Sequence, residues 1–208
     1  MASSRIEYMY CKMEQEIMYD KSLDSGSNTC DTSLPTFDFQ RLQEGEEETI
    51  SALRKACHEI GFFYLINTPI SKEQWHRIFS DADLFFALQE SEKNSINMSR
   101  VTNFRGYTSL GEEVTLGKPD NKEVLDLATV PWADRDVSDE PYHRFHGSNQ
   151  WPAENLIPGF QKRVEHYMES MSVVGLEVMR ALALALRLPR LYFDPFFSDP
   201  YYMMRMIH

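Results

Sequence analysis

The chain has 208 residues, which is enough for one well-filled hydrophobic core with a short tail. Apolar residues make up 42% and charged residues 25%, a composition typical of globular proteins that fold in water. The formal net charge is −11 and the Lys and Arg residues form no basic stripe, so no nucleic-acid partner is expected.

Cysteine usage and the N-terminal sequence indicate the cytoplasm. Cys11, Cys30 and Cys57 are odd in number and far apart, so they predict neither a disulfide framework nor a metal-binding pair, and they fit a reducing compartment. Residues 1–20 carry four carboxylates and lack the apolar centre of a signal peptide. No apolar run approaches the roughly 20 residues of a membrane helix. The expected location is therefore cytoplasmic, with no membrane partner.

Residues 1–66 predict a tail, a strand, a helix and a second strand. The tail, 1–33, is expected to be flexible because its end is rich in small and polar residues. Apolar and polar residues alternate over 34–39, as in a short strand. Over 46–60 apolar residues recur at three- and four-residue steps, and Gly61 follows as a natural helix cap. The apolar run 62–66 predicts a strand buried on both faces. The helical stripe consists of Ile50, Leu53, Cys57 and Ile60.

The rest of the chain predicts two more helices and a final strand. Ser71 and Gln74 have the spacing of a capping box, and the helix that follows carries an aromatic stripe expected to pack in a core. Residues 90–153 are rich in loops. A helix of about eight turns is expected within 154–188, and 201–208 predict a strand. The two helical stripes are Trp75, Ile78, Phe79, Ala82, Phe85 and Phe86, and then Phe160, Val164, Tyr167, Met171, Val174, Val178, Ala181, Leu182 and Ala185.

Several stretches carry a family resemblance through their order and spacing. They are 34–38 with 60–65, then 104–107 with 111–112, then 122–126, and finally 149–152 with 158–160 and 186–189. Over residues 34–208 the chain resembles the N-terminal part of the non-haem Fe(II)/2-oxoglutarate-dependent dioxygenases related to isopenicillin N synthase.

The resemblance implies an α+β fold. A helix-rich N-terminal dioxygenase domain with short strands, 34–153, would lead into 154–208, the long helix and the first strand of an incomplete double-stranded β-helix, or jelly roll. The implied function is that of an oxidoreductase that couples decarboxylation of 2-oxoglutarate to hydroxylation or desaturation of a small organic molecule. Fe(II) and 2-oxoglutarate are the implied cofactors. The oligomeric state is left open.

The resemblance also suggests residues that contact the substrate. Phe104, Arg105 and Tyr107 are the candidates for lining the mouth of the substrate site. The alternative is that Phe104 and Tyr107 are packing residues and that Arg105 forms a surface ion pair. No catalytic residue is assigned.

A second motif, Asn149, Trp151 and Pro152, is interpreted as a structural clamp. Asn149 can bond to nearby backbone, Trp151 can anchor the loop in the core, and Pro152 fixes its exit. The sequence departs from the family at Arg187, where a glycine is usual. We expect the helix to continue by one residue there, because arginine would be strained at a positive φ.

The six histidines do not supply the iron triad of the family, which is a His-x-Asp pair and a later His. His58 and Glu59 are adjacent, so on a helix they would point about 100° apart. His143 and His146 could face one metal from a loop, but no carboxylate stands at a suitable spacing, and a solvated or loop-capping role is favoured. The iron ligands are therefore expected outside this chain, and no metal ligand is assigned within it.

Two hypotheses remain open from the sequence. In the first, the chain is the N-terminal part of a dioxygenase, catalytically incomplete as it stands. In the second, it is a truncated, non-catalytic isoform or remnant that acts, if at all, as a binding module. An in-frame His-x-Asp within a few dozen codons after His208 would support the first, and an immediate stop codon would support the second.

Overall fold

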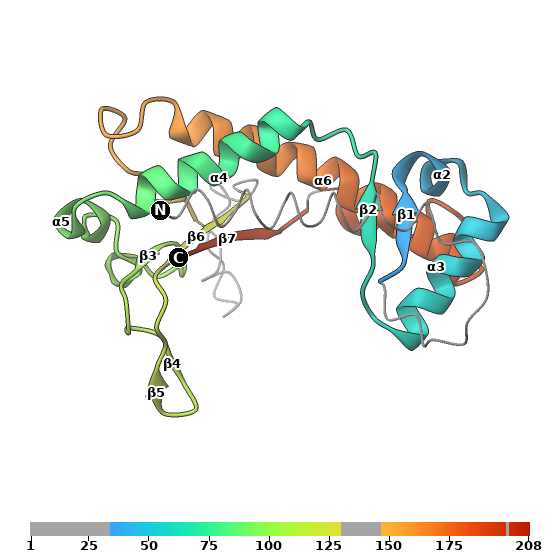
Figure 1. The fold of residues 1–208 in the computed structure, drawn as a ribbon, viewed down its shortest axis with the longest axis horizontal. Helices are drawn as coiled ribbons and strands as arrows, with labels where there is room; N and C mark the ends of the chain where they lie inside the picture. The colour runs from blue at the N-terminus through green and yellow to red at the C-terminus, as the bar shows by residue number, and fades with distance from the viewer. Residues whose placement is uncertain (1–33, 130–146, 199) are drawn as a thin grey trace, which may run out of the picture. The chain divides into compact units, whose positions relative to one another are not determined.

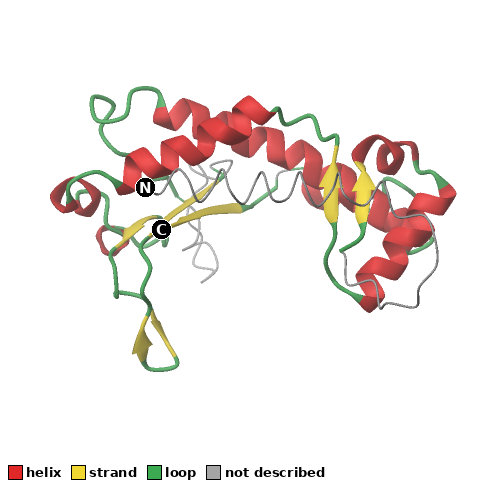
Figure 2. Ribbon diagram, in the orientation of Figure 1, coloured by secondary structure: helices red, strands yellow, loops and turns green. Residues whose placement is uncertain are grey.

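The computed structural model describes residues 34–129, 147–198 and 200–208. Within it, Leu34–His208 form one compact unit that contains both helices and strands (Figures 1 and 2). This confirms a mixed helix and strand fold. The predicted tail lies outside the described residues, and the predicted division after residue 153 stays a prediction. No helix among the described residues is long and apolar enough to span a membrane.

The first half of the unit begins with a strand, two helices and a second strand. These are β1 (Thr36–Asp38), α2 (Phe39–Glu44), α3 (Glu47–Glu59) and β2 (Tyr64–Ile66). Next come α4 (Lys72–Phe86), α5 (Glu90–Asn94) and η2 (Met98–Arg100), then β3 (Gly106–Thr108), β4 (Val114–Thr115), β5 (Lys118–Pro119) and β6 (Val124–Ala128). The unit ends with α6 (Phe160–Ala185), η4 (Asp194–Phe197) and β7 (Met203–Ile207).

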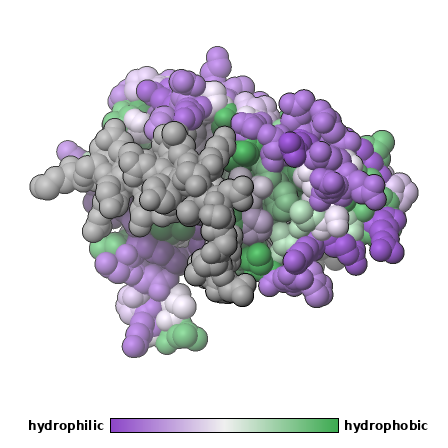
Figure 3. Space-filling view, turned by 45° about the vertical axis from the view of Figure 1, so that its right-hand side comes forward, coloured by the Kyte–Doolittle hydropathy of each residue, from purple (hydrophilic) through white to green (hydrophobic). Residues whose placement is uncertain are grey.

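The described strands of the unit form three small sheets. β1 and β2 pair in parallel, β4 and β5 form a hairpin, and β3, β6 and β7 form an antiparallel sheet in that order. β6 is the central strand of the third sheet, and all five of its residues are buried. The hairpin ends in Leu116, which is 98% exposed at a positive φ. Figure 3 shows a small apolar patch at the lower end of the molecule.

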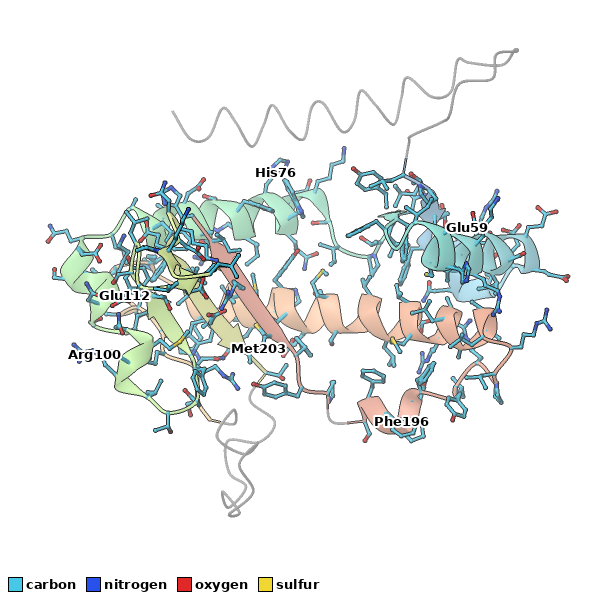
Figure 4. All side chains as sticks on the ribbon, turned by 90° about the horizontal axis from the view of Figure 1, so that it is seen from below. Glu59, His76, Arg100, Glu112, Phe196 and Met203 are labelled. Atoms are coloured by element: carbon cyan, nitrogen blue, oxygen red, sulfur yellow. The ribbon has the colours of Figure 1, made fainter. Side chains whose placement is uncertain are left out.

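The long helix α6 connects two hydrophobic cores. Its first turns pack with α4 and with β3, β6 and β7 in one core, to which Phe160 and Val164 contribute. Its last turns pack with α2 and α3 in a second core, through Ala181 and Ala185. A helix of 26 residues is about 39 Å long, so it can reach both cores. Figures 1 and 4 show α4 lying beside α6.

The helix starts were predicted better than the buried faces. The capping box at Ser71 and Gln74 is confirmed, and both of its hydrogen bonds are present. In α3, Ile50 and Leu53 are buried as predicted, whereas Cys57 and Ile60 are exposed, because Ala56 occupies that edge of the face.

Further predictions of burial are wrong. The run 62–66 is not buried on both faces and forms a strand only over Tyr64–Ile66. Phe62 is 71% and Tyr64 38% exposed on one side, whereas Phe63 and Leu65 on the other side pack on the second core. Phe79 on α4 and Met171 on α6 are also exposed, by 37% and 42%, so the buried face of each helix is narrower than its apolar stripe.

The expectation that the helix continues past Leu186 is wrong as well. α6 ends at Ala185, and Arg187 has φ +62°, the left-handed conformation that favours glycine. The Arg187 amide donates to Leu184 O (2.8 Å) and the Leu188 amide to Ala183 O (2.8 Å). These two bonds satisfy the last helical carbonyls and hold the arginine in its strained conformation.

Arg187→Gly is therefore expected to raise the free energy of unfolding by about 1 kcal/mol, because glycine removes the left-handed penalty. Urea denaturation of both proteins would measure the difference. Arg187→Ala is the control, since it removes the side chain but keeps the strain and should give no gain. Equal stability of the glycine variant and the parent would show that Arg187 is not strained.

Candidate functional site

The polar residues of the predicted site gather around the sheet formed by β3, β6 and β7. One face of this sheet packs on α4 and α6 through alternate residues such as Leu125 and Leu127. Three groups of polar side chains surround the sheet: one around Arg105, one around Glu123 and one around Asp126.

Arg105 is completely buried just before β3. Its Nη1 donates to Asn149 Oδ1 (3.0 Å), its Nη2 donates to the Tyr201 hydroxyl (3.4 Å), and its guanidinium lies 5.5 Å from the centre of the Tyr201 ring. Burial lowers the pKa of Arg105, but an arginine keeps its charge in proteins. The surface ion pair considered for Arg105 is wrong, because none of this side chain reaches the surface.

Asn149 connects three parts of this region. Its Nδ2 donates to Ala128 O (2.8 Å), and its Oδ1 accepts from Ala128 N (2.9 Å) as well as from Arg105. The amide therefore satisfies both backbone groups of Ala128, the last residue of β6, and fixes the orientation of the buried guanidinium. Next to it, Trp151 packs edge-on against Phe160 with ring centres 6.1 Å apart. Pro152 is buried.

Asn149→Ala is expected to lower the free energy of unfolding by about 2 kcal/mol, because it leaves buried backbone groups of Ala128 without partners. Chemical denaturation would measure the loss. Asn155→Ala is the matched control, because Asn155 is exposed in the same loop and should change stability by less than about 0.5 kcal/mol. Equal effects of the two substitutions would contradict a clamp at Asn149.

Gln150 packs against Gly106, a contact between distant residues that no sequence pattern indicates. Gln150 Nε2 donates to Arg105 O (2.8 Å) and to Asn97 O (3.2 Å). Gly106 has φ +116°, and a Cβ at this position would lie 2.3 Å from Ile96 O and 2.4 Å from Gln150 Nε2. A glycine is therefore required for the backbone to pass under the amide. The sequence shows the glycine before Tyr107 but not the partner that approaches it.

Glu123 is the centre of the second group. It accepts hydrogen bonds from Lys93 Nζ (2.5 Å), from the Tyr107 hydroxyl (2.5 Å) and from His208 Nδ1 (3.0 Å). Burial alone would raise the pKa of Glu123, but the bonds from these three donors outweigh it and lower the pKa. Burial and the adjacent Glu123 raise the pKa of Tyr107, so its phenol stays protonated and donates. The His208 ring also stacks on Phe86.

Asp126 and Arg205 form the third group, on neighbouring strands at paired positions. Arg205 binds both oxygens of the buried Asp126 carboxylate, at 2.7 and 2.8 Å, and its Nη1 donates to Glu113 Oε1 (3.1 Å). The Asp126 hydrogen bonds raise the pKa of Arg205. Glu113 also pairs with Lys122 (2.7 Å), so a chain of ion pairs joins the sheet to the base of the hairpin. No sequence pattern signals this pairing, because it depends on strand register.

The three residues predicted to line the substrate mouth occupy different environments. Phe104 is 51% exposed at φ +58°, Arg105 is buried against Asn149, and the Tyr107 ring lies in the first core. Of the three, only Phe104 is exposed to solvent. Their contact with a substrate stays a prediction.

The described residues do not fit an iron site. Across 34–129, 147–198 and 200–208, no three His, Cys, Asp or Glu side chains lie close enough together to hold a metal ion. The Glu123 and Asp126 carboxylates are engaged by Lys93 and Arg205. His143 and His146 lie outside the described residues.

Comparison with known proteins identifies the family. The model of the family described as "non-haem dioxygenase in morphine synthesis N-terminal" matches residues 34–154, more than half of the chain. The chain belongs to this family. The match covers the Phe104–Tyr107 and Asn149–Pro152 segments, and the resemblance found in the sequence is confirmed.

Relatives of the dioxygenase family support the same assignment. The chain is 35% identical over 168 residues to the 2-oxoglutarate-dependent dioxygenase frbJ of Dothideomycetidae sp. (strain 11243), covering 80% of this chain and 45% of the relative. It is 31% identical over 191 residues to the homoarginine-6-hydroxylase 2-ODD-C23.1 of Arabidopsis thaliana, covering 84% and 55%. The chain thus spans about half the length of the curated relatives it matches.

A solved structure from Neurospora crassa shows the same fold. This full-length fungal protein, crystallised in complex with alpha-KG and thymine, superposes on the chain with a TM-score of 0.68 at 27% identity. The superposition covers 88% of this chain and 57% of the fungal chain.

Proposed function

We propose that this chain is the N-terminal part of an Fe(II)/2-oxoglutarate-dependent oxidoreductase that hydroxylates or desaturates a small organic molecule. The observation that carries the proposal is the family match over 34–154, which includes both the Arg105 region and its Asn149 clamp. Relatives named as 2-oxoglutarate-dependent dioxygenases and hydroxylases support it.

The cofactors proposed are Fe(II) and 2-oxoglutarate. The Neurospora crassa structure contains alpha-KG, and its likeness to this chain supports the same co-substrate here. When bound, iron with 2-oxoglutarate supplies the activation of O₂. Because the described residues do not fit an iron site, the ligands are proposed to lie in the part of the family fold that this chain does not span.

The sheet of β3, β6 and β7 is proposed to be one portion of a jelly roll, with α4 and α6 covering its outer face. The segment Phe104–Tyr107 is proposed to stand at the substrate mouth. Phe104 would offer the apolar contact, whereas the buried Arg105 and the Tyr107 ring in the first core would hold the segment in place. A cytoplasmic location stays a prediction from cysteine usage.

The test uses the natural protein that contains these residues. We expect the purified protein, supplied with Fe(II) and 2-oxoglutarate, to bind one equivalent of iron and to form succinate in amounts that rise when its substrate is added. Phe104→Ala should raise KM for the organic substrate without changing the KM for 2-oxoglutarate, because the exposed Phe104 ring would offer only an apolar contact. Failure to form succinate with iron bound would overturn the proposal and favour a non-catalytic binding module.

A further inference from the structure

A groove lies between α4 and α6, outside the three polar groups that surround the sheet. It encloses a cavity of about 400 Å³, within the range of small-molecule sites. Its walls come from successive turns of two helices that lie side by side (Figure 4). The lining residues are Glu73, Gln74, Arg77 and Ile78 of α4, and Arg163, His166 and Tyr167 of α6.

The floor of the groove is apolar and carries one unused donor. Ile78 is buried, and the Tyr167 ring packs against the first core. Within the described part of the chain, the Tyr167 hydroxyl makes no hydrogen bond, and burial raises the pKa of this phenol. A protonated, half-buried phenol that lines a cavity can donate to an acceptor on a ligand.

Two of the charged side chains in the groove are already engaged. Arg163 binds both oxygens of Asp81 at 2.7 Å and donates to Pro158 O, so its guanidinium is held by protein acceptors. The Glu73 carboxylate is held by its own backbone amide and by Ser71 at the first turn of α4, and these bonds lower its pKa.

Arg77 is different, because its side chain is 51% exposed and its contact with Asp81 is 3.5 Å long. Gln74 adds a side-chain amide beside it, placed by a 3.2 Å contact with His166 Nε2. The groove therefore combines an apolar floor with an exposed guanidinium and a phenol donor.

We propose that this groove binds a small aromatic carboxylate. The ring would lie on Ile78 and Tyr167, and the carboxylate would accept hydrogen bonds from Arg77 and from the Tyr167 hydroxyl. A carboxylate fits because a guanidinium can bind both of its oxygens. The groove shares no lining residue with the sheet of β3, β6 and β7. Binding in the groove can therefore be tested independently of the proposed oxidoreductase function.

The probe is benzoate, added to the full 208-residue chain and followed by ¹H–¹⁵N NMR. We expect saturable shifts of the Gln74 side-chain amide and of backbone amides in 73–78 and 163–167. Benzamide, which has the same shape without the charge, should bind roughly tenfold more weakly, as expected for the loss of one charged contact.

Two variants locate the binding, and a third is the control. Arg77→Gln and Tyr167→Phe should each weaken benzoate binding roughly three- to tenfold while the spectrum keeps its dispersion. His76→Ala should leave binding unchanged, because His76 lies on the side of α4 that faces away from α6 (Figure 4). Benzoate shifts that do not saturate, that map elsewhere, or that persist unchanged in Arg77→Gln would overturn the proposal.

Discussion

Glu123→Gln is expected to lower the free energy of unfolding by about 3 kcal/mol, measured by urea denaturation at neutral pH. The substitution removes the carboxylate that pairs with the buried Lys93 at 2.5 Å. Breaking a buried ion pair by removing one partner costs more than the pair contributes, because the remaining charge stays buried. Lys93 would keep Phe86 O (3.3 Å), the more exposed Glu90 (3.4 Å) and the Tyr107 ring, whose centre lies 5.2 Å from Nζ.

The same network predicts a pH dependence. The folded pKa of Glu123 is below its usual value, so its contribution to stability is fully present above the unfolded pKa of about 4.3. That contribution is lost as the pH falls through the lower, folded pKa. The difference in stability between the parent and Glu123→Gln should therefore shrink as the pH is lowered from about 6 to about 3.

Glu59→Gln is the matched control for this carboxylate. Glu59 is exposed at the end of α3 and pairs with Lys55 at 3.9 Å (Figure 4). Such a surface pair contributes less than about 1 kcal/mol, so its loss should have little effect at any pH. A stability difference for Glu123→Gln that stays constant between about pH 6 and about pH 3 would contradict the assigned role of Glu123.

Asp81→Ala is expected to lower the free energy of unfolding by about 3 kcal/mol, because it too removes one partner of a buried ion pair. Asp81 is completely buried on α4 and accepts two 2.7 Å hydrogen bonds from Arg163 of α6. The alanine variant leaves that guanidinium partly buried without its carboxylate. Thermal or urea unfolding would measure the loss.

A double-mutant cycle separates the pair from the helix packing around it. Asp81→Leu combined with Arg163→Met should recover a large part of the loss, because apolar residues of similar size often replace a buried pair at little cost. We expect a coupling energy of about 2 kcal/mol between the two positions. Additive effects of the two single substitutions would show that the pair does not join α4 to α6.

Local features of the fold could be predicted from the sequence, and long-range pairing could not. The capping box at Ser71 involves residues three positions apart, so the pattern contains both partners. The Asp81–Arg163 and Asp126–Arg205 pairs join residues separated by 82 and 79 positions. Such pairs depend on how helices cross and how strands align, which hydrophobic periodicity does not specify.

In the candidate site, too, local features could be predicted from the sequence and long-range contacts could not. The motif around Asn149 was interpreted as a clamp from residue types alone, but its partner, Ala128, became known only with the end of β6 in place. At Arg187 the residue type led to a wrong prediction. An arginine disfavours a positive φ, yet Arg187 has one. The two hydrogen bonds at the end of α6 hold that conformation against the local preference.

The most direct test of the proposed function is the fate of molecular oxygen. The natural protein that contains residues 34–208 is supplied with Fe(II), 2-oxoglutarate and ¹⁸O₂, and the succinate is analysed by mass spectrometry. Decarboxylation of 2-oxoglutarate by a dioxygenase places one oxygen atom of O₂ in succinate, so we predict singly labelled succinate. Iron-loaded protein that yields no labelled succinate would contradict the assignment of this chain to an active 2-oxoglutarate-dependent oxidoreductase.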